Sequence, residues 1–125
     1  MAAATKSLKA AYDKAYQKTL KDVAEWFVRR CTEEIEADKW PYLTQPKMRD
    51  IVASGRLRDS VRIIPRPGGA FDVVWEADYS TEVHEGVTTL AGVAVLARPW
   101  TREPLKELPA KFAELLQANI RLYAP

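Results

Sequence analysis

Residues 61–76 read VRIIPRPGGAFDVVWE, two β-rich runs on either side of a segment of proline and glycine. This pattern predicts a β-hairpin with a flexible tip over residues 65–70. Phe71, Val73 and Trp75 alternate along the second run, so one face of the hairpin is apolar and is expected to meet the core. A third strand is expected over residues 93–97.

Before the hairpin, apolar side chains recur every three or four residues, as on one face of an α-helix. They are Leu8, Tyr12, Tyr16, Leu20, Val23, Phe27, Cys31 and Ile35. A long helix is therefore predicted over residues 8–37, with residues 1–7 as a flexible arm. At about 1.5 Å per residue it is roughly 40 Å long, so it overhangs the core of a small domain. Part of its apolar face is expected to meet another surface.

The charges of this helix are segregated along its length. Up to Lys21 it carries five lysines against Asp13, and from Asp22 to Asp38 it carries six acids against two arginines. The helix dipole prefers the opposite order. Two interpretations stay open: a solvated face whose charges are screened by salt, or basic and acidic ends that pair between neighbouring subunits. The second predicts assembly that weakens as salt rises.

After the hairpin, a second apolar stripe predicts a terminal helix over residues 101–123. Its members are Leu105, Leu108, Phe112, Leu115, Leu116, Ile120 and Tyr123. Thr101 is placed as the N-cap, and Pro104 fits the first turn. Pro109 either kinks this helix or begins another.

The chain is thus predicted to be one α+β domain, residues 1–125. A long N-terminal helix and a C-terminal helix pack on a small, mainly antiparallel β-sheet. The β-rich middle spans residues 54–100. Prolines make residues 38–49 a linker, with a short helical turn over residues 48–52.

The composition is that of a globular protein. Of 125 residues, 47% are hydrophobic and 29% charged, and the net charge of +2 argues against a dedicated nucleic-acid binder. The single cysteine forms no internal disulfide. No stretch approaches the ~18 consecutive apolar residues of a membrane span, and the N-terminus has no signal-peptide pattern. Neither a membrane nor a secretory location is expected.

The sequence offers little catalytic chemistry, so no enzymatic activity, cofactor or metal is predicted. His84 is the only histidine, and neither CxxC nor HExxH is present. A cation-dependent hydrolase centred on His84 is the enzyme alternative, although lone histidines are more often structural. Ser54, Ser60 and Ser80 lack the Gly-x-Ser-x-Gly turn of a nucleophile. Cys31 lies on the apolar stripe and is interpreted as a buried small hydrophobe.

Four arginines next to the strands are candidate interface residues: Arg56, Arg58, Arg62 and Arg66. They fit a charged strand edge, an acidic protein partner or a nucleic-acid backbone. The balanced net charge favours the first two.

The chain also has four tryptophans, a residue type that frequently anchors interfaces. Trp40 is the candidate interface residue among them. Trp75 has the strand parity of a core position. Trp26 and Trp100 either anchor an interface or cap the core.

Three ordered segments carry a family resemblance: SGRLRDSV (54–61), YSTEVHEG (79–86) and ARPW (97–100). Around a hairpin and after a long first helix, they resemble the neck or tail-completion proteins of long-tailed bacteriophages and prophages. The resemblance extends from Ser54 to about Leu122. Ser80 departs from the family, in which alanine commonly follows the tyrosine.

Eight residues carry this resemblance: Gly55, Leu57, Ser60, Tyr79, Gly86, Arg98, Pro99 and Trp100. Several have physical roles of their own. Gly55 permits a turn that a Cβ would bar, and Ser60 can bond backbone groups at the turn into the strand. Gly86 ends its segment, and Pro99 marks the exit from strand to helix. Such roles suit a structural subunit.

The resemblance implies a homo-oligomeric ring, a hexamer or dodecamer, around the DNA channel of a head-to-tail junction. The implied partners are head-closure or adaptor proteins, and the tail tube or tail terminator, with possible non-specific contact with DNA. The implied location is the virion, and the host cytoplasm during assembly. A tail terminator is the alternative within this class. A small nucleic-acid-binding module, using the four arginines in a salt-sensitive manner, is the alternative outside it.

Overall fold

The computed structural model describes residues 2–36, 56–77, 80–85, 87–88, 94–95 and 99–124. In chain order the elements are α1 (Ala2–Glu36), α3 (Arg56–Asp59), β1 (Val61–Pro65), the 3-10 turn η2 (Pro67–Gly69), β2 (Phe71–Trp75), α4 (Ser80–Glu85), β3 (Val87–Thr88), β4 (Ala94–Val95) and α5 (Arg102–Tyr123). This arrangement confirms the predicted α+β class.

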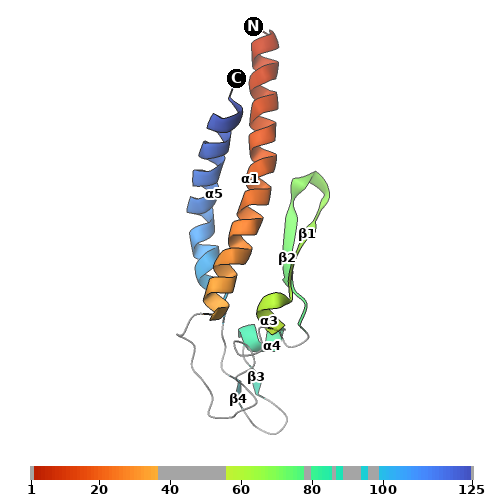
Figure 1. Cartoon of the computed structure of the whole chain (residues 1–125), viewed down its shortest axis with the longest axis vertical. Helices are drawn as coiled ribbons and strands as arrows, with labels where there is room; N and C mark the ends of the chain where they lie inside the picture. Colours follow the sequence, from red (N-terminus) through yellow and green to blue (C-terminus); the bar gives the residue numbers. More distant parts are fainter. Residues whose placement is uncertain are drawn as a thin grey trace.

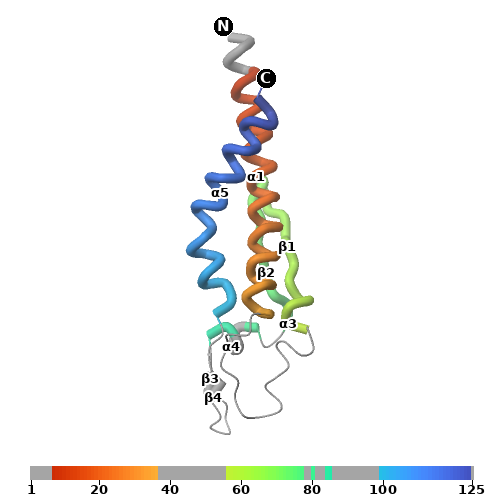
Figure 2. The backbone as a smooth tube through the Cα atoms, turned by 60° about the vertical axis from the view of Figure 1, so that its left-hand side comes forward, coloured from red at the N-terminus to blue at the C-terminus, as the bar shows by residue number. Residues whose placement is uncertain are grey.

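Two antiparallel helices, α1 and α5, set the long axis of the molecule. The β1–β2 hairpin lies along α1, and α5 lies along it on another side (Figure 1). Both chain termini lie at the same end of the helix pair, as the turned view also shows (Figure 2). We call this the distal end, and the opposite end, which holds Glu36 and Arg102, the proximal end.

The hairpin has a continuous antiparallel register, from Val61 opposite Trp75 to Pro65 opposite Phe71. Gly68 at the tip has φ of 80°, a left-handed conformation that glycine adopts without strain. A Cβ on Gly69 would collide with the side chain of Gln17, so the tip rests on α1 at that residue. The predicted hairpin is confirmed, with Pro65 still paired.

The core lies at the proximal end, where side chains from four parts of the chain meet. Its buried members are Phe27, Cys31, Ile35, Leu57 and Trp100. Trp75 packs edge-on against Trp100 with centroids 5.6 Å apart. Trp100 is only 2% exposed, and Trp26 packs against the same cluster. Trp100 is therefore a core residue, and Trp26 is a partly buried residue that packs against the core.

The structure differs from the prediction at the ends of the helices. α1 begins at Ala2, so residues 2–7, expected as an arm, extend the helix; three of them are alanines, the strongest helix formers. α5 runs through Pro109 as one helix. Pro109 is exposed, so water can replace the backbone hydrogen bond that proline removes. Thr101 precedes α5 at the predicted N-cap position, but its side chain accepts no hydrogen bond from a backbone N–H of the helix.

The strands also differ from one predicted sheet. β4 pairs with β3 and not with the hairpin, so the described strands form two separate two-stranded antiparallel sheets. The expected third strand, residues 93–97, shrinks in the described residues to Ala94–Val95. The predicted linker 38–49 and the turn 48–52 lie outside the described residues. Among the described helices, none is long and apolar enough to cross a bilayer.

Candidate assembly surfaces

The distal end of α1 presents an apolar row to solvent. Leu8 is 59% exposed, Tyr12 49% and Tyr16 38%, and we call these three residues the distal patch. The hairpin tip meets α1 at Gln17, and α5 supplies Phe112 against Tyr16, with aromatic centroids 6.3 Å apart. The overhang expected from the length of the helix is therefore present: Leu8 and Tyr12 are largely uncovered, and Tyr16 is partly covered by Phe112.

An apolar groove of about 510 Å³ opens further along the same row. Its floor is α1, one wall is β2 and the other wall is α5. The lining includes Leu20, Val23, Phe27, Phe71, Val73, Leu105 and Leu108. Leu105, at the rim, is 54% exposed. One molecule therefore carries two open apolar surfaces, the distal patch and the apolar groove, at different heights along α1.

A buried polar contact joins α1 and α5 between these surfaces. Asn119 is 5% exposed and donates to Thr19 Oγ1 at 2.9 Å and to Asp22 Oδ2 at 3.1 Å. Thr19 in turn donates to the Ala15 carbonyl at 2.7 Å. Burial favours a higher pKa for Asp22, but the hydrogen bonds from Lys18 and Asn119 outweigh it and lower the pKa. Because only one register satisfies these groups, this contact aligns the two helices.

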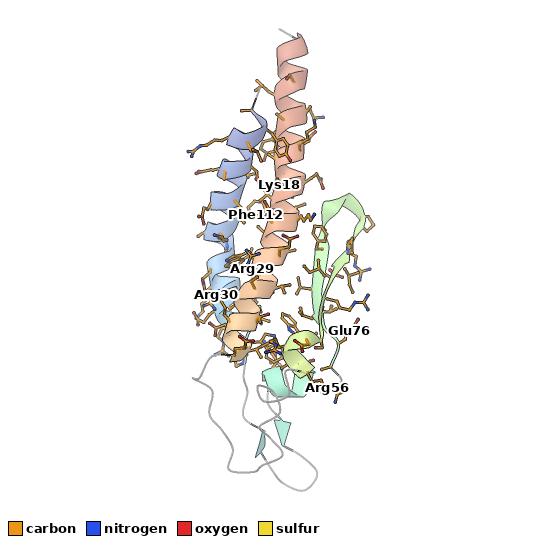
Figure 3. The ribbon with its side chains drawn as sticks, viewed as in Figure 1. Lys18, Arg29, Arg30, Arg56, Glu76 and Phe112 are labelled. Atoms are coloured by element: carbon orange, nitrogen blue, oxygen red, sulfur yellow. The ribbon has the colours of Figure 1, made fainter. Side chains whose placement is uncertain are left out.

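A second polar contact joins the helices near the proximal end. Arg30 reaches from α1 to Glu107 of α5 at 2.9 Å and also pairs with Glu34 at 2.7 Å (Figure 3). Arginine suits this position because its planar fork can hold two carboxylates at once. Together with the Asn119 contact, it holds α5 along most of its length.

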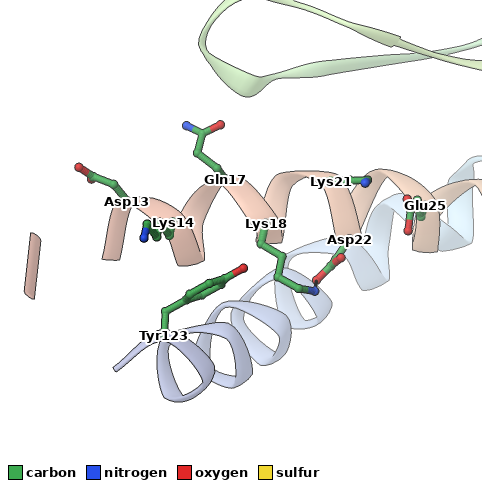
Figure 4. A pocket seen from close by; sticks show the side chains of 8 residues that line it. All are labelled: Asp13, Lys14, Gln17, Lys18, Lys21, Asp22, Glu25 and Tyr123. Carbon is green, nitrogen blue, oxygen red and sulfur yellow. Dashed lines mark hydrogen bonds and ion pairs between the residues drawn. The ribbon is translucent and has the colours of Figure 1, made fainter. Parts of the chain in front are cut away.

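A polar hollow of about 690 Å³ lies on α1 beside the end of α5 (Figure 4). Its lining has three lysines and three acids, with Gln17 and Tyr123. Lys18 pairs with Asp22 at 2.7 Å across it. Because the formal charges balance, this hollow offers no preference for an anion or a cation.

Three of the four arginines expected at an interface are held by neighbouring acids. Arg58 pairs with Asp59 and Glu36, each at 2.9 Å, and its hydrogen bond lowers the pKa of Asp59. Two further pairs lie on the outer face of the hairpin: Arg62 with Glu76 at 3.0 Å, and Arg66 with Asp72 at 2.6 Å. Arg56 is exposed at the start of α3. These contacts favour a charge-paired strand edge over a nucleic-acid surface.

The motif residues that the structure describes serve the fold. Leu57 is fully buried, and Ser60 donates to its carbonyl at 2.7 Å, so the predicted backbone bond of Ser60 is confirmed. Pro99 begins the turn into α5, where its carbonyl accepts from Arg102 N, and Trp100 fills the core. The remaining motif residues Gly55, Tyr79, Gly86 and Arg98, and the interface candidate Trp40, lie outside the described residues.

His84 and Cys31 have structural surroundings. The His84 imidazole packs on Trp100 at 4.7 Å and hydrogen-bonds with Thr101 Oγ1 at 2.8 Å and with Glu85. Within the described residues, no group of three metal-ligating side chains gathers. Cys31 is fully buried, and this burial raises the pKa of its thiol to about 12. The Cys31 prediction, a buried hydrophobe, is confirmed.

Sequence reasoning missed Asn119 and the apolar groove. One signal for Asn119 was available: it is a polar residue beside Leu115, Leu116 and Ile120 in the last apolar stripe. Its partner Thr19 lies 100 positions away, so the contact itself needed the structure.

Comparisons of the chain with protein-family models, curated proteins and solved structures found no match.

Proposed function

We propose that this chain is a structural subunit of the head-to-tail junction of a long-tailed bacteriophage, of the neck or tail-completion type. In this proposal it forms a homo-oligomeric ring, a hexamer or dodecamer, around the DNA channel. Its neighbours along the particle are head-closure or adaptor proteins on one side, and the tail tube or terminator on the other. The proposed location is the virion.

The observation that carries the proposal is the pair of open apolar surfaces on one subunit. Large exposed apolar surface marks an interaction site in a water-exposed protein. Two different surfaces on one chain suit a heterologous interface, the type from which rings close by rotation. The ordered motifs in 54–61, 79–86 and 97–100 supply the phage context by resemblance.

Negative-stain images of the purified chain test this proposal. The expected result is a uniform population of closed rings with a central hole wide enough for duplex DNA. Open filaments, irregular aggregates or single small particles would contradict it. Images at low and high salt in parallel would show whether charge contributes to ring closure.

A further inference from the structure

We infer that the free edge of β2 is a docking site for an extended segment of another polypeptide, which adds to the hairpin as a third strand. The side chains on one face of this added strand fill the apolar groove. This inference goes beyond the proposed function, because it gives the groove a ligand whether or not copies of the chain form a ring.

Two hydrogen bonds at the ends of the hairpin show which backbone groups of β2 are used. Glu76 N donates to the Ser60 carbonyl at 3.0 Å, and Arg66 N donates to the Ala70 carbonyl at 2.8 Å. In an antiparallel pair, residues that bond across the ladder alternate with residues that turn their backbone groups outward. In this continuous register the even-numbered residues of β2 bond to β1, and its odd-numbered residues face the free edge.

The outward residues of β2 are Phe71, Val73 and Trp75, and each presents one N–H donor and one C=O acceptor. Among the described residues, no strand pairs with β2 on this side. Such an edge is a template on which another chain adds a strand. Because an extended backbone matches donors and acceptors in this alternating order, the edge selects a strand and not a helix as its occupant.

The apolar groove runs along this same edge. Its lining includes all of residues 70–74 and, among the described residues, none of β1. Neighbouring residues of a strand point to opposite faces, so a consecutive run lines a groove only where the strand edge itself borders it. A strand added to β2 therefore lies over α1, with alternate side chains between Phe27 of α1 and Leu108 of α5.

The size of the groove favours one strand over the hairpin of a second copy. The inner half of a strand as long as β2, five residues, is about 17 Å long, about 4.8 Å wide and about 5 Å deep, or about 400 Å³. The groove, which α5 walls on its far side, holds about 510 Å³. A second copy can offer its own β2 edge only with β1 attached, and two strands need about 800 Å³. The occupant is thus a single extended segment with apolar residues at alternate positions.

The free edge of β1 provides a comparison within the same hairpin. Its outward residues are Val61, Ile63 and Pro65, and Pro65 has no N–H to donate. Proline on an outer strand blocks further pairing. Since β2 contains no proline, the two edges of the hairpin differ in what they can bind.

A library of random peptides of about 12 residues, long enough to span the edge, is the probe and is selected on the full chain. Val73→Pro removes the central N–H of the β2 edge and leaves the bonds to β1 in place. Ile63→Pro is the matched control, because it removes an outward N–H in the same way from the other edge. Circular dichroism and tryptophan fluorescence check that both variants keep the wild-type fold.

The selected peptides are expected to carry apolar residues at alternate positions. In fluorescence anisotropy, a synthetic peptide of their consensus is expected to bind Val73→Pro at least tenfold more weakly than the wild type, and Ile63→Pro like the wild type. Apolar residues at helical spacing, equal binding to Val73→Pro or no enrichment of any peptide would overturn the inference. Loss of self-association in Val73→Pro alone, measured by sedimentation velocity, would assign the edge to a second copy and also overturn it.

Amide hydrogen exchange followed by NMR provides a readout that needs no variant. The selected peptide is expected to slow exchange at least tenfold at Phe71 and Val73 and to leave Val61 and Ile63 unchanged. Protection elsewhere without protection of Phe71 and Val73 would overturn the inference. Closed rings formed by a chain that binds no such peptide would overturn it and leave the proposed function standing, whereas peptide binding by a chain that forms no rings would support the inference alone.

Discussion

Replacing Asn119 with alanine is expected to loosen the pairing of α1 and α5. The change removes a hydrogen bond to the Thr19 hydroxyl, worth about 1 kcal/mol, and one to the Asp22 carboxylate, worth about 1.5–3 kcal/mol. Neither partner is left alone, since Asp22 keeps Lys18 at 2.7 Å and Thr19 keeps the Ala15 carbonyl. The loss therefore falls at the low end of the summed range, about 2.5 kcal/mol of unfolding free energy.

Urea unfolding followed by tryptophan fluorescence measures this loss, with protein dilute enough to remain unassociated. Asn119→Leu is the matched control, because it removes the same hydrogen bonds but restores apolar volume between the helices. It is expected to lose less than about 1 kcal/mol, since apolar burial offsets the lost bonds. A double-mutant cycle with Thr19→Val isolates the coupling free energy between Asn119 and Thr19, which is expected to be about 0.5–1 kcal/mol.

Two results would refute the reasoning about Asn119. If Asn119→Ala lost less than about 0.5 kcal/mol, the buried polar contact would contribute nothing beyond ordinary surface substitutions. If Asn119→Leu lost nothing and the Asn119–Thr19 cycle gave no coupling, lost packing and not lost hydrogen bonds would explain the alanine result. Either result would also remove the argument that this contact aligns the two helices.

Further predictions concern the core, the thiol, pH and the hairpin. Trp100→Ala removes the centre of the core and should cost about 3–5 kcal/mol in urea unfolding; a loss below about 1 kcal/mol would contradict its placement. Cys31, with its pKa raised to about 12, should react with a thiol reagent at pH 8 far more slowly in the folded chain than in denaturant, and equal rates would contradict its burial. Because the pKa of Asp22 is lowered, its carboxylate stabilises the fold at pH values above its ordinary pKa of 3.8, and this contribution is lost as the pH falls below 3.8. The unfolding free energy of Asp22→Asn should therefore fall less on acidification than that of the wild type. Arg62→Gln breaks an exposed pair with Glu76 and should cost less than about 1 kcal/mol, so a larger loss would contradict its exposed setting.

The helices and the hairpin could be predicted because their signals are local. The spacing of Leu8 through Ile35 indicates one helix face wherever that helix packs, and the Pro-Gly tip between two β-rich runs indicates a hairpin. The length of the first helix also correctly implied an overhang. The third strand was harder to predict from the sequence, because β4 has only two residues and the sequence of its partner β3 gave no strand signal of its own.

The candidate surfaces depend on tertiary distances that the sequence does not encode locally. Leu8 and Phe27 belong to the same stripe, yet one is exposed and the other buried, because the hairpin tip stops at Gln17. The arginine cluster was visible in the sequence, whereas its partners became clear only with the strand register. Arg62 lies opposite Val74, which places Glu76 as its diagonal neighbour on the outer face.

The particle mass of the purified chain, measured by light scattering across protein concentration, tests the central claim most directly. A ring-forming subunit is expected to give one dominant mass at six or twelve times the 14.1 kDa of the chain. That mass should persist on dilution at low salt and fall towards the monomer as salt rises. A mass of one chain at every concentration and salt would contradict the account, and so would a mass that grows without limit.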